Sequence, residues 1–333
     1  MIATNRRSAL IGLSATVTAA AVSSAFAQTA ASQTSAWPSR PVRIIVPVAA
    51  GTATDLTARI FGEKLAARWG QGVVVEAKPG ADGLIAIGAF VSATDEHTLL
   101  FSFSTAVSLN PLIHAKLAYD PAVDLVPITT TSEVLFLIAV NAGVGASTMT
   151  ELSAIARANP GKLNWASAPG LPRFVFERFR REQGLDMAYV PYTQTGAAVQ
   201  DLGEGRLQLM IASLGSVLPV IEAGKARPLV MASSARSTLL PSVAHASEAG
   251  FPTLAVPAVG CAFGWRGMSA ALRDRIAADI DQVAQDEAIR SQLGKIGQAI
   301  HRSTPGELAK LLARQRVEMA PIADIMAQTS AKH

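Results

Sequence analysis

Short apolar runs alternate with amphipathic segments along most of the chain. The first run, VRIIVP, leads through a turn of small residues into a segment with a helical repeat of apolar positions, namely Leu56, Ile60, Phe61 and Leu65. Gly70 follows where a helix cap is expected. The strands VVVE and TLLFSFST then enclose the apolar helix LIAIGAFVSA. This alternation predicts a parallel α/β sheet, in which ligands bind beyond the carboxyl ends of the strands.

A second alternation of strands and helices begins at VLFLIAVN, after a crossing segment, YDPAVDLVPIT, that contains Pro and Asp. It ends at the strand ARPLVMAS and is long enough for a separate sheet. The segment PAVGCAFGWRGM is predicted as a return strand, and two final helical segments follow, the first broken near Asp286. Because these helices have no strands of their own, they must pack on a sheet already made. We expect a discontinuous first lobe, residues 37–133 plus 259–333, and a second lobe, residues 134–258.

The first residues have the three-part pattern of an export signal. Arg6 and Arg7 precede an apolar run rich in Ala, Ser and Thr that finishes at Ala25-Phe26-Ala27. A membrane anchor is the alternative, but no stop-transfer flank follows the run. We expect residues 1–27 to be cleaved and the mature chain to be exported, with both the Sec and the twin-arginine routes open.

The composition fits a globular protein and excludes several classes. The chain has 333 residues, of which 50% are hydrophobic and 16% are charged, enough for one large or two medium domains. Removing Arg6 and Arg7 with the signal lowers the net charge from +4 to +2, which is too mild for a nucleic-acid partner. Cys261 is the only cysteine, so the exported protein has no internal disulfide and depends on its core for stability.

The sequence shows no set of residues typical of catalysis or metal binding. It has no nucleophile elbow, no P-loop and no dinucleotide-binding fingerprint, and no histidine has the spacing of a zinc site. Scattered carboxylates are most often surface or capping groups. We therefore expect no enzyme activity, no metal and no cofactor. The histidines are His97, His114, His245, His301 and His333.

Four predicted strands end in small or hydroxyl residues. Such residues leave backbone N–H groups uncovered at a helix start, where the helix dipole favours an anion. Ordinary helix capping is the alternative for each turn taken alone, and Asp55 in the first helical turn favours a cap. Four similar turns on two sheets favour a binding cleft for a carboxylate. The turns are Ala49-Ala50-Gly51-Thr52, Ser104-Thr105, Ser167-Ala168-Pro169-Gly170 and Thr193-Gln194-Thr195.

The stretch WPSRPVRIIVPVAAGTATDLTARIFGEKLAARWGQGVVVEAKPGADG resembles the start of the Bug family, the periplasmic substrate-binding proteins of tripartite tricarboxylate transporters. Family members begin with W/Y-P-x-[KR]-P-[IV]-[RK] and continue with P-[FY]-x-x-G-G-x-x-D. The likeness extends through SLNPLIHAKLAYDPAVDLVPIT, LSAIARANPGKLNWASA and YVPY to the closing helices. It therefore covers essentially the whole mature chain.

The resemblance implies a type II periplasmic-binding-protein fold, in which two α/β lobes close over a ligand cleft. Family ligands are mostly small organic acids. One carboxylate usually meets the first turn and the turn after an N-[YW]-A-S strand. In this chain the first turn corresponds to residues 49–52 with Asp55, and the second follows the segment 164–168.

The chain departs from the family pattern at four places, one of which is Asp82 in the turn KPGADG, where Gly is common. Thr52 replaces the second Gly of the first turn and adds a hydroxyl. The loop after the second strand contains Pro169 and Pro172, which lack N–H donors, and Arg173, which is either a bidentate grip on a carboxylate or a surface residue of a basic helix face. Ser213, after Ala212, stands where Asp or Asn is frequent, which favours a carboxylate with an apolar body.

We predict an exported, monomeric receptor without enzyme activity. It captures a small organic acid and presents it to the membrane permease subunits of a tripartite transporter. The alternative is a receptor that presents its ligand to a membrane sensor kinase; an enzyme is the third possibility. Neighbouring genes would separate transport from signalling. The predicted ligand-binding residues are Ala49, Ala50, Gly51, Thr52, Asp55, Ser104, Thr105, Ser167, Ala168, Gly170, Arg173, Thr195 and Ser213.

Overall fold

The computed structural model describes residues 37–93, 95–168, 170–255 and 258–330. The chain divides after Arg40 into two units, and the larger one, which begins at Pro41, holds every helix and strand discussed below. The predicted signal, residues 1–27, lies outside the described residues. Within the described ranges no helix combines the length and the apolar character needed to cross a membrane.

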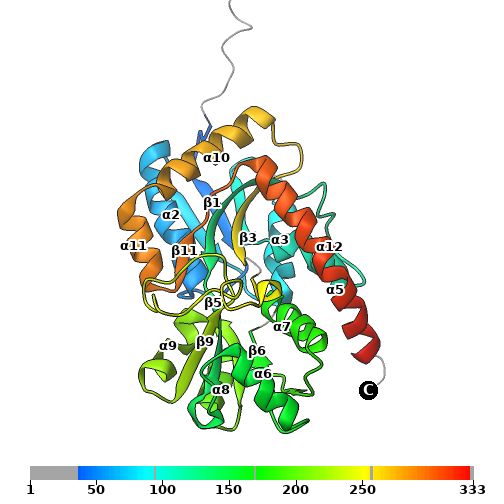
Figure 1. The fold of residues 1–333 in the computed structure, drawn as a ribbon. Coiled ribbons are helices and arrows are strands. Elements are labelled where there is room, and N and C mark those ends of the chain that lie inside the picture. Colours follow the sequence, from blue (N-terminus) through cyan, green and yellow to red (C-terminus); the bar gives the residue numbers. More distant parts are fainter. Residues whose placement is uncertain (1–36, 94, 169, 256–257, 331–333) are drawn as a thin grey trace, which may run out of the picture. The chain divides into compact units, whose positions relative to one another are not determined.

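Two β-sheets form within the larger unit (Figure 1). The six-stranded sheet has the order β11-β4-β10-β3-β1-β2 and the five-stranded sheet the order β7-β6-β8-β5-β9. The first sheet takes its strands from both ends of the chain and the second from the middle, so the predicted discontinuous first lobe is confirmed. The exact lobe boundaries remain a prediction. The strands are β1 Val42–Val46, β2 Val73–Ala77, β3 Thr98–Phe103, β4 Val126–Val134, β5 Phe136–Asn141, β6 Asn164–Ser167, β7 Ala188–Tyr189, β8 Leu209–Ser213, β9 Ala226–Met231, β10 Val259–Gly264 and β11 Gln298–Ile300.

Both sheets are mixed, so the prediction of a parallel sheet is wrong in part. Strand β1 is parallel to β2 and β3, but β10 is antiparallel to β3 and β4, and β11 is antiparallel to β4. The reversed strands are those that follow the five-stranded sheet in the chain. The chain leaves the six-stranded sheet at the end of β4 and returns at the start of β10, and a strand that enters at the end where its neighbour leaves must run the other way.

Strand β4 was predicted as part of a crossing, and β11 was not predicted as a strand. Strand β4 lies between β11 and β10, yet its sequence VPITTTSEV is rich in hydroxyl residues that suggest a loop. The threonine hydroxyls of β4 can be buried because they form hydrogen bonds with the segment 301–303. Thr129 Oγ1 donates to the carbonyl of Ser303 at 2.6 Å, and Thr130 Oγ1 donates to the carbonyl of His301 at 3.0 Å.

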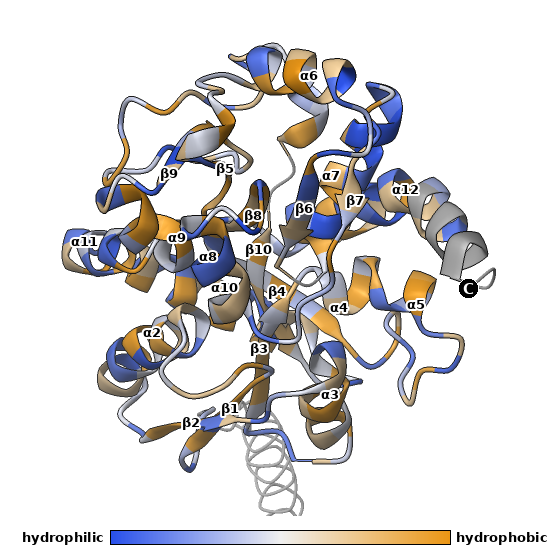
Figure 2. Ribbon diagram, turned by 90° about the horizontal axis from the view of Figure 1, so that it is seen from below, coloured by the Kyte–Doolittle hydropathy of each residue, from blue (hydrophilic) through white to orange (hydrophobic). Residues whose placement is uncertain are grey.

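Helices cover both faces of each sheet (Figure 1). On the six-stranded sheet, α2, α10 and α11 contact one side and α3 and α12 the other. Figure 2 shows α3 as apolar along most of its length, and its buried Ile87 and Phe90 join Leu308 of α12 in one core cluster. The helices are α2 Ala53–Trp69, α3 Leu84–Val91, α4 Thr105–Ser108, α5 Asn110–Ile113, α6 Met149–Ala158, α7 Leu171–Glu182, α8 Thr195–Gly203, α9 Leu214–Glu222, α10 Ala270–Ala284, α11 Glu287–Lys295 and α12 Pro305–Ser330.

Helix α12 packs against the cores of both sheets. Leu308 and Leu312 belong to the core cluster of the six-stranded sheet. Met319 and Ala323, further along the helix, belong to the cluster around Trp165 of the five-stranded sheet. The two sheets are therefore linked by a helix as well as by the chain crossings.

The predicted helix ends are confirmed, but two predicted core residues, Leu56 and Ile60, are not fully buried. Gly70 caps α2 with a positive φ of 65°, and Asp286 is the N-cap of α11 and accepts a hydrogen bond from the N–H of Ala288. Leu56 is exposed, while Phe61 and Leu65 are fully buried. Leu56 faces a cavity, because it lies in the helical turn nearest the ends of the strands.

Candidate functional site

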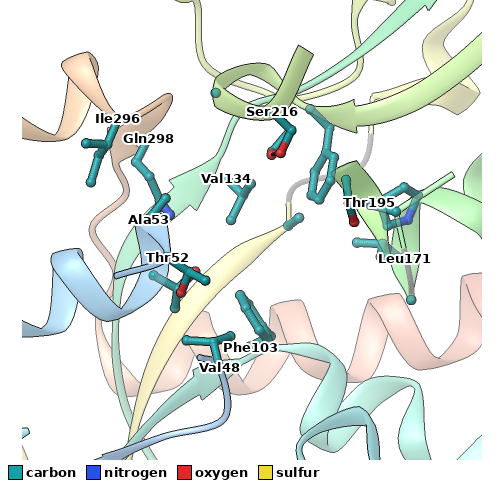
Figure 3. A pocket seen from close by; sticks show the side chains of 18 of the residues that line it. Val48, Thr52, Ala53, Phe103, Val134, Leu171, Thr195, Ser216, Ile296 and Gln298 are labelled. Carbon is teal, nitrogen blue, oxygen red and sulfur yellow. Dashed lines mark hydrogen bonds between the residues drawn. The ribbon is translucent and has the colours of Figure 1, made fainter. Parts of the chain in front are cut away.

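Two adjoining cavities lie at the ends of strands from both sheets. The first has a volume of about 640 Å³ and includes residues that follow β1 and β3 of one sheet and β6 and β8 of the other (Figure 3). The second has a volume of about 850 Å³. Val48, Phe103, Thr105 and Gly170 line both cavities, which makes them parts of one cleft.

The structure brings most of the predicted binding residues to this cleft, but not all of them. Ser167 and Arg173 line the second cavity, together with the shared Thr105 and Gly170. Ala49, Ala50 and Asp55 are not among the residues that line either cavity. Those in the first cavity are Gly51, Thr52, Ser104, Thr105, Ala168, Gly170, Thr195 and Ser213.

Asp55 stabilises the turn after β1 through a hydrogen bond to its backbone. Its carboxylate is fully buried and accepts hydrogen bonds from the N–H of Gly51 at 2.9 Å and from both Nε and Nη2 of Arg59 at 2.9 and 3.1 Å. Burial raises the pKa of Asp55, but the bonds from Arg59 and Gly51 and the charge of Arg59 outweigh burial and lower the pKa below its ordinary value. The carboxylate is therefore ionised at neutral pH, and its charge is matched by Arg59.

The start of helix α2 keeps free hydrogen-bond donors. Thr52, the N-cap residue, makes no side-chain cap, and the described residues provide no acceptor for the backbone N–H groups of Ala53 and Thr54. Both residues line the first cavity. Because the first N–H groups of a helix carry partial positive charge, this end of the helix attracts an anion.

The hydroxyl of Thr52 plays a different part from the one predicted. Its Oγ1 donates to the carbonyl of Ala49 at 2.8 Å, so the hydroxyl proton is already used within the turn. The residue is exposed and lines the first cavity. Thr52 therefore stabilises the turn and presents only acceptor lone pairs and a methyl group to the cavity.

Two serines of the cleft have buried hydroxyls without a partner among the described residues. Ser104, which follows β3, is fully buried, and Ser167, at the end of β6, is 8% exposed. The Oγ atom of each makes no hydrogen bond with the described chain. Ser104 lines the first cavity and Ser167 the second, so each is placed to bond a ligand from one of the two sheets.

The turn after β6 gives way directly to helix α7. Gly170 has φ 79° and ψ −136°, a conformation that favours glycine, and Pro172 stands in the first turn of the helix, where its missing N–H has no intrahelical partner to lose. Pro169, predicted to stiffen this loop, lies outside the described residues. The N–H of Ala168 donates a hydrogen bond to the carbonyl of Ile211 in β8 at 2.8 Å. This bond anchors the turn to the sheet.

Arg173 lies in the first turn of α7 and lines the second cavity. Its guanidinium carbon lies 4.5 Å from the centre of the Tyr189 ring, and no described carboxylate forms an ion pair with it. The stacked ring orients the planar guanidinium and leaves its edge available. This placement favours an anion-binding role over the alternative of a basic surface face.

The five-stranded sheet contributes further hydroxyls through Thr195 and Ser213. Thr195 is the first residue of α8, and Ser213 is the N-cap of α9. The Oγ atoms of Ser213 and Ser216 lie 2.7 Å apart in a hydrogen bond. All three residues line the first cavity, so its wall on this side is polar and uncharged.

Several wall residues were missed from the sequence. Phe103, Phe136, Leu171 and Ile296 give the first cavity apolar walls, and Gln298 adds an amide (Figure 3). Apolar residues carry no signal that distinguishes a cavity wall from a core. Gln298 does carry one, since a lone amide among the short apolar side chains of IGQAI suggests a buried polar group with a partner to find.

The described residues show no arrangement for metal or thiol chemistry. No group of three or more His, Cys, Asp or Glu among them is placed to hold a metal ion. Cys261 is fully buried in β10, and burial raises the pKa of its thiol, which disfavours the reactive thiolate. The cleft is thus equipped for hydrogen bonding to an anion with an apolar body.

Residues 57–325 match the family model described as "Tripartite tricarboxylate transporter family receptor". A UPF0065 protein of Bordetella bronchiseptica is 32% identical over 289 residues, which cover 86% of this chain and 86% of that protein. The match therefore extends over both sheets.

Two solved structures from Rhodopseudomonas palustris share the fold. MatC with bound malate is 27% identical with a TM-score of 0.71, covering 86% of this chain and 100% of that one. Rpa4515 with adipate is 25% identical with a TM-score of 0.75, covering 86% of this chain and 97% of that one.

Proposed function

Because the chain belongs to the tripartite tricarboxylate transporter receptor family, we propose that it is a periplasmic receptor for a small organic carboxylate. It binds the acid between its two lobes and delivers it to the membrane permease of a tripartite transporter. The family consists of solute receptors, and malate and adipate, held by two relatives, are small carboxylates.

The observation that carries this proposal is the chemistry of the first cavity. Ala53 and Thr54, whose N–H groups have no acceptor among the described residues, line it at the start of α2, and so does Ser104, whose buried hydroxyl has no partner there. None of its described lining residues is acidic, and the single charged one is the exposed Lys295. A cavity that offers donors and no negative charge favours an anion.

Capture requires that both lobes contact the ligand. The donors of α2 and Ser104 belong to the six-stranded sheet, while Ala168, Thr195 and Ser213 belong to elements of the five-stranded sheet. A ligand that touches both sets binds the closed arrangement more tightly than an open one, and this difference in affinity shifts the population toward closure. The permease then has a closed, loaded form to recognise.

A thermal-shift panel of organic acids tests the proposal. An acid present at 100 times its Kd should stabilise the folded protein by about 2.7 kcal/mol and raise Tm by ~5 °C. The matched controls are the primary amides of the same acids, which have similar shape but no charge and should give little shift. A panel of mono-, di- and tricarboxylates that leaves Tm unchanged at millimolar concentration would contradict the proposal.

The same panel on an Arg173→Ala variant tests the guanidinium. If Arg173 holds a carboxylate oxygen, the variant should bind the best acid about 10-fold to 100-fold more weakly, because a charge-assisted hydrogen bond is lost. Arg181→Ala is the matched control, since Arg181 pairs with Glu177 on the same helix and lines neither cavity. Equal affinities for Arg173→Ala and the wild type would assign Arg173 to the surface instead.

A further inference from the structure

Gln298 is a buried amide without a partner in the wall of the first cavity. It is 2% exposed, and neither Nε2 nor Oε1 makes a hydrogen bond with the described residues. Among the described side chains, Gln298 is the only one with two buried polar atoms that lack a hydrogen-bond partner. Buried amides are almost always paired, because an unmet donor and acceptor both cost free energy. An unpaired amide in the wall of a binding cavity points to a ligand group that pairs with it.

The backbone around Gln298 fixes its position. Gln298 begins β11 and stands opposite Val134 of β4. The preceding Gly297 has φ +71°, and a Cβ there would lie 2.8 Å from the backbone nitrogen of Gly215, so only glycine fits this close approach. The carbonyl of Gly297 also accepts from the N–H of Leu135 at 3.1 Å. Contacts with neighbouring segments therefore hold the backbone at Gln298 in place.

The side chain of Gln298 extends from β11 in the direction of the start of helix α2 (Figure 3), whose residues Ala53 and Thr54 line the same cavity. The free N–H groups of Ala53 and Thr54 lie at that same helix start. A carboxylate that accepts from these N–H groups would therefore lie in the cavity whose wall contains the amide. The donor Nε2 suits the carboxylate itself, and the acceptor Oε1 needs a second ligand group that carries a proton.

We propose that Gln298 selects acids that carry a hydroxyl beside the carboxylate, that is, 2-hydroxy carboxylates. In this arrangement Nε2 donates to a carboxylate oxygen and Oε1 accepts from the hydroxyl of the neighbouring carbon. The assignment rests on the proposed function, since it presupposes a carboxylate at the start of α2. It adds the residue that discriminates among carboxylates.

The surroundings of Gln298 favour a hydroxyl over an ammonium group. An amino acid also carries a donor beside its carboxylate, but its ammonium is a full positive charge. No acidic side chain stands among the described residues that line the first cavity, so the ammonium would be buried without a counter-charge, which is costly. The neutral amide of Gln298 is sufficient for a hydroxyl.

The test compares acids that differ only at the carbon beside the carboxylate. Two sets are titrated by calorimetry: mandelate, phenylacetate and phenylglycine, and lactate, propionate and alanine. In the better-bound set the hydroxy acid should bind the wild type about 30-fold tighter than the acid without a substituent, as expected for one buried hydrogen bond. The amino acid should bind more weakly than the hydroxy acid.

Two variants assign the preference to Gln298. Gln298→Leu should reduce the ratio between hydroxy acid and plain acid to less than about 3-fold, because the partner of the hydroxyl is gone. Gln298→Glu keeps the shape but replaces the donor by a carboxylate, and it should weaken both acids more than about 10-fold; it provides the test if the Leu variant does not fold. Gln200→Leu, the same change at an exposed position of α8 that lines neither cavity, is the control that should keep the 30-fold ratio.

The outcomes separate this inference from the proposed function. If carboxylates bind the wild type without preferring the hydroxy acid, or if the preference persists in Gln298→Leu, the role of Gln298 is wrong and the carboxylate receptor stands. If carboxylates of the wider thermal-shift panel fail to bind at all, both proposals fail.

Discussion

A Ser104→Asp variant should lose at least 100-fold in affinity for the acid that binds best. Ser104 is fully buried, and its hydroxyl has no partner among the described residues. It lines the first cavity, and none of the described residues that line this cavity is acidic. A new carboxylate at this place repels a bound carboxylate by ~3 kcal/mol at a separation of ~6 Å and an effective dielectric constant of ~20. Calorimetric titration at pH 7 measures the loss.

The matched variant Ser104→Asn separates charge from size. Asn has nearly the shape of Asp but no charge and keeps a donor, so this variant should bind within about 10-fold of the wild type. Lowering the pH should partly restore binding to Ser104→Asp, because the buried carboxyl takes up a proton. Equal losses in the two variants would mean that crowding, and not charge, governs this wall of the cavity.

A Glu133→Ala variant should lose about 3 kcal/mol of unfolding free energy. Glu133 lies near the end of β4 and is 1% exposed, and its carboxylate accepts hydrogen bonds from both the N–H and the Oγ of Ser234, each at 2.5 Å. Ser234 follows β9 of the other sheet. Hydrogen bonds to a charged group stabilise by roughly 1.5–3 kcal/mol each, and two are lost. Urea unfolding monitored by circular dichroism measures the change.

Ser234→Ala is the control for the Glu133 variant. It removes the hydroxyl bond and keeps the bond from the backbone N–H, so its loss should be about half as large. Because the contact joins segments of the two sheets, Glu133→Ala should also weaken ligand binding. If Glu133→Ala lowers the free energy of unfolding by less than about 0.5 kcal/mol, the contact between the sheets is energetically unimportant.

Much of the fold was readable from the sequence, because its elements obey simple periodicities. The apolar run of β1, the cap at Gly70 and the break at Asp286 each depend on neighbouring residues alone. Strand β4 was missed because its threonines are buried through bonds to Ser303 and His301, about 170 positions away in the chain. Such partners leave no local pattern.

The sequence predicted those parts of the candidate site that are turns at strand ends, but not those that depend on contacts between side chains distant in the chain. The turns at Gly51 and Ser104 follow strand ends, and the topology of an α/β fold brings strand ends together. The role of Asp55 as the support of the first turn, with Arg59 as its partner, needed the actual distances. Gln298 stands on a strand that the sequence pattern did not predict, and the wall that it joins includes residues from both sheets.

The most direct test of the account is the structure of the protein with the acid that binds best in the thermal-shift panel. We expect a carboxylate oxygen within hydrogen-bond distance, roughly 2.7–3.2 Å, of the backbone N–H groups of Ala53 and Thr54, with Ser104 and elements of the five-stranded sheet also in contact. A carboxylate bound elsewhere, for example in the cavity lined by Arg236, Arg290 and Arg302, with the start of α2 untouched, would contradict it.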